Sequence, residues 1–108
     1  MQYNQAVAGF LNVFDFESIT VSTTAIALTA AKVKGNPPDD DGSAKGAFIS
    51  CEGNVVRYRL DGTDPTASVG HELAVGGTLQ LANYQQIVDV RFIRRDSSDG
   101  TLRVSYQR

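Results

Sequence analysis

The chain has 108 residues, 42% of them hydrophobic and 20% charged, and a formal net charge of −2. A chain of this length forms one domain with one hydrophobic core, because chains divide into several domains only beyond roughly 250–300 residues. The ordinary composition argues against wholesale disorder. The slightly negative charge argues against nucleic acid as a partner, since phosphate neutralisation needs a basic face.

Cys51 is the single cysteine, so no intrachain disulfide can form, and assembly in the cytosol fits best. We interpret its side chain as a small buried hydrophobe. No apolar run approaches the ~18–20 residues of a membrane span, and the first residues lack the charged start of a secretory signal. We therefore expect no membrane partner and a cytoplasmic product, unless it leaves as part of a larger particle.

The opening segment, residues 1–16, is interpreted as an N-terminal arm. Phe10, Val13 and Phe14 could share one face of a short helix, whereas Gly9 fits an extended arm equally well. The arm carries too many large apolar side chains to leave in water, so they either plug the domain's own sandwich or contact a neighbouring subunit. These side chains are Val7, Phe10, Leu11, Val13, Phe14 and Phe16.

From residue 17 onward, alternating apolar and polar residues indicate about seven short β-strands. Turn signals separate them at regular intervals, which predicts an all-β domain over residues 17–108, an antiparallel β-sandwich of jelly-roll or immunoglobulin-like type. Arg57 and Arg59 alternate with apolar residues, and we expect both to lie on a solvated face. The expected strands are residues 17–22, 25–30, 45–53, 54–62, 77–83, 87–96 and 101–108.

The apolar face of each expected strand gives a predicted core, because a shift of one residue would turn the whole apolar set to solvent. The predicted core residues are Ile19, Val21, Ile26, Leu28, Phe48, Val56, Tyr58, Leu79, Leu81, Val90, Phe92, Val104 and Tyr106.

Residues 32–46 are interpreted as a long exposed loop. Pro37 and Pro38 cannot donate to a strand ladder, and the charges of this segment do not suit a core. The run Asp39–Asp41 before Gly42 suggests a calcium loop, but the alternating acid pattern and a distal glutamate are missing, so we expect no metal. Loops of this length are often functional, which leaves a solvated loop and a partner contact as alternatives.

The segment "VRYRLDGTDPTASVGHEL", residues 56–73, places a polar run between two apolar ones and holds the only histidine. Turn chemistry accounts for its special residues. Glycine supplies positive φ, Pro65 fixes φ, and aspartate side chains bond local backbone groups. We therefore predict a structural turn formed by Asp61, Gly62, Asp64, Pro65 and Gly70.

Catalysis would have to involve His71. A nucleophile and an orienting acid can be proposed from Ser68 or Ser105 and from Asp61 or Asp64, but no nucleophile elbow accompanies them. One histidine and one cysteine are also too few for a zinc site. We predict that the protein is not an enzyme, has no catalytic residues and binds no cofactor.

The run "YRLDGTDPTASVGHELAVGGTLQL" followed by "VDVRFIRRDSSDGTLRVSY" resembles a pattern found in small structural proteins of tailed bacteriophages. The resemblance covers residues 56–108 and does not extend to the first half. The core "YRLDGTDPT" is also similar to a strand and turn of immunoglobulin-like modules appended to chitobiases, where it is structural.

The phage resemblance implies a non-enzymatic virion protein, assembled in the host cytoplasm. Its expected role is capsid decoration or cement, with a tail or head-to-tail protein, or a carbohydrate- or receptor-binding module, as alternatives. The expected partners are further copies of the chain, with a trimer preferred, and a major capsid or tail protein. The expected subunit contacts are Val7, Phe10, Leu11, Phe14, Pro37, Pro38 and Asp40.

Overall fold

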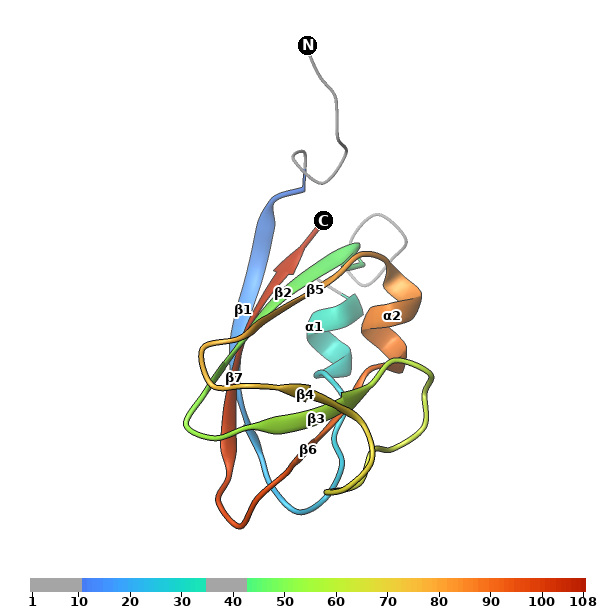
Figure 1. Ribbon diagram of the computed structural model, residues 1–108. Helices are drawn as coiled ribbons and strands as arrows, with labels where there is room; N and C mark the ends of the chain where they lie inside the picture. Colours follow the sequence, from blue (N-terminus) through green and yellow to red (C-terminus); the bar gives the residue numbers. More distant parts are fainter. Residues whose placement is uncertain (1–10, 35–42) are drawn as a thin grey trace.

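The computed structural model describes residues 11–34 and 43–108. Its seven strands and two short helices are arranged as two antiparallel sheets (Figure 1), which confirms the predicted all-β, sandwich-like fold. The elements are β1 (Val13–Val21), α1 (Ala30–Lys34), β2 (Gly46–Glu52), β3 (Val56–Arg59), β4 (His71–Leu73), β5 (Thr78–Leu81), α2 (Tyr84–Asp89), β6 (Arg91–Arg94) and β7 (Gly100–Gln107).

One sheet has four strands in the order β1-β7-β2-β5, and the other has three in the order β4-β3-β6. In Figure 1 the three-stranded sheet crosses the lower half of the four-stranded sheet, while α1 and α2 lie beside the upper half. In the immunoglobulin constant-type order the first strand pairs with the second, whereas here β1 pairs with β7. The strand order of this sandwich therefore differs from that of the immunoglobulin constant-type fold.

The core lies between the four-stranded sheet and the layer formed by the three-stranded sheet and the helices. Alternation buries one face of β7, where Leu102, Val104 and Tyr106 are fully enclosed. Phe92 of β6 is also fully enclosed, on the opposing layer. Among the described residues, Tyr106 and Phe92 are the largest fully buried side chains, so they are the main packing elements of the sandwich.

The two sheets meet closely where β7 begins. A Cβ atom at Gly100 would lie 2.6 Å from Cγ1 of Val56 and 2.7 Å from the carbonyl oxygen of Asn54. No side chain fits in that space without movement of β3 or of the turn before it. The glycine is therefore required by the corner that joins the sheets.

The prediction of a strand over residues 25–30 is wrong. Ile26 makes only an isolated bridge with Phe92, and the chain then turns into α1. The carbonyl oxygen of Thr29 accepts from the N–H groups of Lys32 and Val33, each at 3.0 Å. Alanine and lysine favour this helical turn, and the burial of Val33 anchors it.

The prediction of one strand over residues 87–96 is wrong in its first half. The Asn83 side chain accepts from the N–H of Gln86 at 2.9 Å and caps α2, which buries Ile87. The strand β6 begins only at Arg91. The helix cap at Asn83 therefore determines the local structure here, although the alternating pattern favours a strand.

The predicted boundary of the arm at residue 16 needs correction, because β1 begins at Val13 and pairs with β7. Within β1, Asp15 and Glu17 lie on the inner side of the strand. Asp15 pairs with Lys32 at 3.1 Å, and Glu17 accepts from the hydroxyl groups of Thr29 and Tyr106. Inward charges and the register shift between Val13 and Asp15 protect this edge strand from further pairing.

The boundaries predicted for the loop over residues 32–46 are wrong at both ends. Residues 32–34 belong to α1, Ala44 is buried, and β2 begins at Gly46. Pro37, Pro38, Asp40 and the rest of the aspartate run lie outside the described residues.

Phe48 is wrongly predicted as a core residue. Its side chain is 41% exposed, whereas Ala47, Ile49 and Cys51 on the other face of β2 are buried. The smaller apolar residues of the alternate set are the ones that pack in the core. Phe48 therefore lies on the outer face of β2, whereas Cys51 is buried as predicted.

Candidate interaction surface

The turn after β3 is organised by its own side chains. Asp61 accepts from the N–H of Thr63 at 3.2 Å and forms an ion pair with Arg59 at 2.5 Å between Nη2 and Oδ2. The Arg59 guanidinium and the Thr63 N–H together hold the pKa of Asp61 below its ordinary value. Gly62 has a φ of 81°, a conformation that suits glycine.

The second half of the loop folds back onto β3. Gly70 has a φ of 144°, and a Cβ there would lie 3.1 Å from Cβ of Pro65 and 3.2 Å from Cβ of Arg57. Pro65 is buried by this approach, while Asp64 stays exposed, 4.0 Å from Nε of Arg91. Asp61, Gly62, Pro65 and Gly70 therefore have a conformational or local bonding role here, whereas the contact of Asp64 is a long ion pair with Arg91 of β6.

Arg57 corrects the expectation that it lies on a solvated face. Its Nε donates to the carbonyl oxygen of Ala67 and its Nη1 to that of Gly70, both at 2.9 Å. Its Nη2 lies 3.2 Å from Glu72, and the side chain is only 18% exposed. One guanidinium thus ties the loop to β3 at two points and pairs with Glu72 of β4, a role that sequence patterning does not reveal.

His71 is an exposed residue of β4, opposite Tyr58 of β3. Its ring lies 5.3 Å from that of Tyr58, centroid to centroid. Ser105 belongs to β7, in the other sheet, and the N–H of Ser68 bonds the hydroxyl of Thr66 within the loop. The histidine is therefore part of an aromatic contact, and Ser105 lies in the sheet that does not contain it.

The buried Cys51 thiol bonds the carbonyl oxygen of Asn54 at 3.2 Å, and burial raises its pKa. No group of three or more metal-ligating side chains occurs within residues 11–34 and 43–108. In the same part of the chain, neither helix has the length and hydrophobicity needed to cross a membrane.

The outer face of the four-stranded sheet carries two exposed aromatic side chains in one row. The register aligns Phe16, Ser105, Phe48 and Gln80 in one row across β1, β7, β2 and β5. Phe16 is 53% and Phe48 is 41% exposed, and each flanks Ser105. Two strand spacings, about 9.6 Å, separate their backbones.

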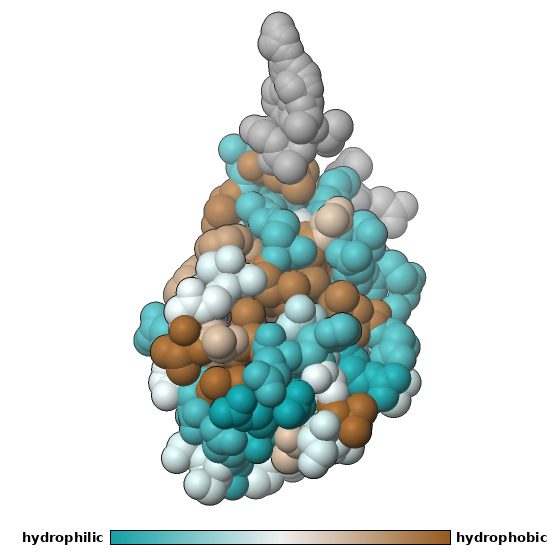
Figure 2. All heavy atoms as spheres, in the orientation of Figure 1, coloured by the Kyte–Doolittle hydropathy of each residue, from teal (hydrophilic) through white to brown (hydrophobic). Residues whose placement is uncertain are grey.

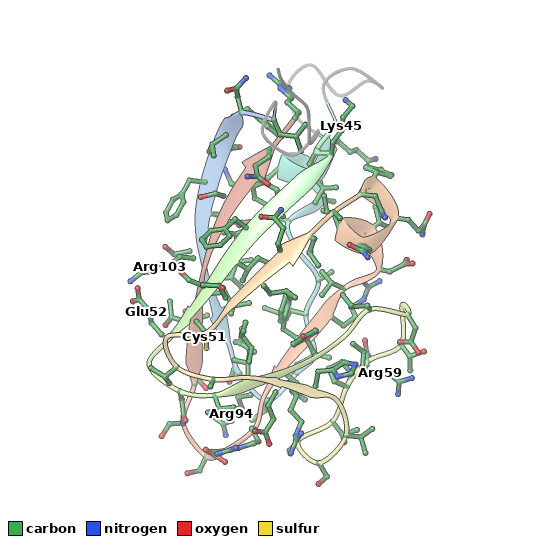
Figure 3. The ribbon with its side chains drawn as sticks, turned by 45° about the horizontal axis from the view of Figure 1, so that its top comes forward. Lys45, Cys51, Glu52, Arg59, Arg94 and Arg103 are labelled. Carbon is green, nitrogen blue, oxygen red and sulfur yellow. The ribbon has the colours of Figure 1, made fainter. Side chains whose placement is uncertain are left out.

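The adjoining rows of this face are polar and uncharged overall. Arg103 donates to the Ser18 hydroxyl at 2.6 Å and pairs with Glu52 at 3.1 Å, so both charges are neutralised locally. Figure 3 shows Arg103 and Glu52 together on the side of the sheet away from the helices. We define the outer sheet face as Phe16, Ser18, Thr20, Phe48, Ser50, Glu52, Thr78, Gln80, Thr101, Arg103 and Ser105.

Two predicted subunit contacts fall within the described residues. Phe14 packs against the core, with its ring 6.4 Å from that of Tyr106 and the Arg108 guanidinium 4.2 Å above it. Leu11 lies next to Gly46 at the start of β2. Both side chains therefore contact their own domain, which is the alternative to a contact with a neighbouring subunit. Val7 and Phe10 lie outside the described residues.

Sequence reasoning missed the outer sheet face because it assigned Phe16 to the arm and Phe48 to the core. The signal was present in residues 46–52. Positions 47, 49 and 51 are all apolar, whereas positions 48, 50 and 52 are Phe, Ser and Glu. A phenylalanine within a polar set indicates an exposed aromatic residue.

Comparison of the chain with protein-family models, with curated proteins and with solved structures gives no match.

Proposed function

We propose that the protein is a non-enzymatic structural component of a multi-subunit particle, and that it binds a neighbouring protein subunit through the outer sheet face. The observation that carries this proposal is the row Phe16–Ser105–Phe48, which exposes two aromatic rings on a regular, locally neutral sheet. Aromatic residues are enriched at protein interfaces, and the absence of net charge on this face argues against nucleic acid as its partner.

Covering the two rings is worth a substantial binding energy. Phenylalanine side chains expose about 150–250 Å² each when free, and roughly half of that is exposed at Phe16 and Phe48. At about 25 cal/mol per Å², their burial contributes about 4–6 kcal/mol before the cost of association. The two rings therefore have the size of a central anchor in a protein interface.

The particle that fits best is a virion. The similarity of residues 56–108 to small structural proteins of tailed bacteriophages supports this, with capsid decoration or cement as the preferred role and a tail or head-to-tail position as the alternative. Homo-oligomerisation, with a trimer preferred, and a major capsid or tail protein as partner belong to the same proposal.

A carbohydrate-binding module has less support. The exposed tyrosines expected of its aromatic platform are not found together among the described residues, which leaves only the rings of Phe16 and Phe48 for such a role. Tyr106 is buried, Tyr58 is half-buried between Phe92 and the His71 ring, and Tyr84 is exposed alone on α2.

The test is co-sedimentation of the full chain with particles from the host that carries its gene. The chain, bearing a small epitope tag, is expressed there, and lysates are fractionated on a density gradient. We expect the tag in the particle fraction at a fixed ratio to the major structural protein. A chain found only among free proteins at the top of the gradient, in lysates that contain intact particles, would contradict the proposal.

A further inference from the structure

The two helices enclose a groove that the proposed function does not use. It has a volume of about 250 Å³ and lies between α1 and α2. Its floor is formed by the buried side chains of Leu28, Val33 and Ile87, and Tyr84 and Val88 are exposed at its edge. Figure 2 shows hydrophobic side chains gathered between the two helices on this face of the molecule.

Two cationic side chains line the same groove. Lys34 comes from the last turn of α1, and Arg91 is the first residue of β6. The Arg91 guanidinium is held in place by its Nη1, which donates to the carbonyl oxygens of Val88 and Val90 at 2.8 and 2.9 Å. Among the described residues no acidic side chain lines the groove, although the chain as a whole has a net charge of −2. Asp64 lies 4.0 Å from Nε of Arg91 but is not part of the lining.

We propose that this groove binds a small carboxylate with a compact, branched apolar body. The apolar floor selects the body, and the two cations select the anion, by charge complementarity. The volume lies below the roughly 300–1,000 Å³ of drug-sized sites, so the ligand is correspondingly small. This inference stands on the groove alone and does not depend on the particle function.

The test is a titration of the isotopically labelled full chain, followed by amide NMR shifts. The probe is 4-methylpentanoate, and 4-methylpentanamide is the uncharged control of the same shape. We expect saturable shifts of the amides of Val33 and Ile87, with a dissociation constant in the low millimolar range, typical of a ligand of under ten heavy atoms. The uncharged control should bind at least about tenfold more weakly.

Two pairs of variants distinguish the contribution of the apolar floor to binding from that of the charged side chains. Ala30→Leu places a larger side chain in the groove and should abolish saturable binding, whereas Ala31→Leu, on the same helix but outside the groove, should leave it unchanged. Lys34→Gln should weaken binding about threefold to tenfold, and Arg103→Gln, on the outer sheet face, should not. All four positions are partly or fully exposed, so folding is retained.

Equal binding of the acid and the amide would overturn the assignment of an anion site. Shifts that stay linear with concentration, or that remain saturable in Ala30→Leu, would overturn the groove as the binding site. Saturable shifts that discriminate the acid and that disappear only in Ala30→Leu would support it.

Discussion

The principal stability prediction concerns Arg57, which anchors the loop between β3 and β4. Arg57→Met keeps the apolar stem but removes the donors to the carbonyl oxygens of Ala67 and Gly70, both at 2.9 Å, and the partner of Glu72. Hydrogen bonds from charged donors contribute about 1.5–3 kcal/mol each. Because water reaches the loop, we take the lower end of that range and expect a total loss of about 2–4 kcal/mol in the free energy of unfolding.

Arg59→Met is the matched control on the same strand, because the Arg59–Asp61 ion pair is solvent-exposed and contributes little. At about 4 °C per kcal/mol for a domain of this size, Arg57→Met should lower Tm by roughly 8–16 °C. Arg59→Met should change it by no more than about 2 °C. Hydrogen exchange of the Val69 amide should also accelerate in Arg57→Met. Equal Tm values for the two variants would refute the anchoring role of Arg57.

Three further predictions concern stability. Gly100→Ala should lower the free energy of unfolding in urea by about 1–3 kcal/mol, because the new Cβ would lie 2.6 Å from Cγ1 of Val56. An unchanged urea midpoint would contradict the close approach of the two sheets at Gly100. Ile49→Ala should lower the free energy of unfolding by about 2–5 kcal/mol, and Phe48→Ala by less than half as much, because Ile49 is buried and Phe48 lies on the outer face. Equal losses of stability in the two variants would contradict these orientations. Tm should be constant above about pH 5 and fall below about pH 4, since carboxylates with a lowered native pKa bind fewer protons in the folded state, and a Tm that rises on acidification would contradict this. The carboxylates concerned are Asp15, Asp61, Asp96 and Asp99.

Alternation predicted the fold well wherever a strand has one apolar and one polar face. In β7, Val104 and Tyr106 alternate with polar residues and are buried as predicted, and Leu102 on the same face is buried with them. Patterning failed at the helices because they are too short to display a helical period. In α2 a single residue, Ile87, is buried, and the Asn83 cap decides the conformation.

The outer sheet face could not be predicted from local patterns, because pairing creates it. Phe16 and Phe48 are far apart in the sequence, and β7 lies between their strands and brings Ser105 into the same row. Predicting that row requires the strand order, which alternation does not encode. The anchoring of the turn by Arg57 was missed for a related reason, since its carbonyl partners lie 10 and 13 residues further along the chain.

The most direct test of the central claim compares two double variants in the gradient experiment. Phe16→Thr/Phe48→Thr removes the exposed rings but keeps residues that suit strands. Val69→Thr/Val75→Thr changes two exposed valines outside the outer sheet face and serves as the control. We expect the phenylalanine variant to keep its Tm within about 5 °C but to lose particle binding by at least about 100-fold, while the valine variant binds normally. Full binding by a folded phenylalanine variant would contradict the claim.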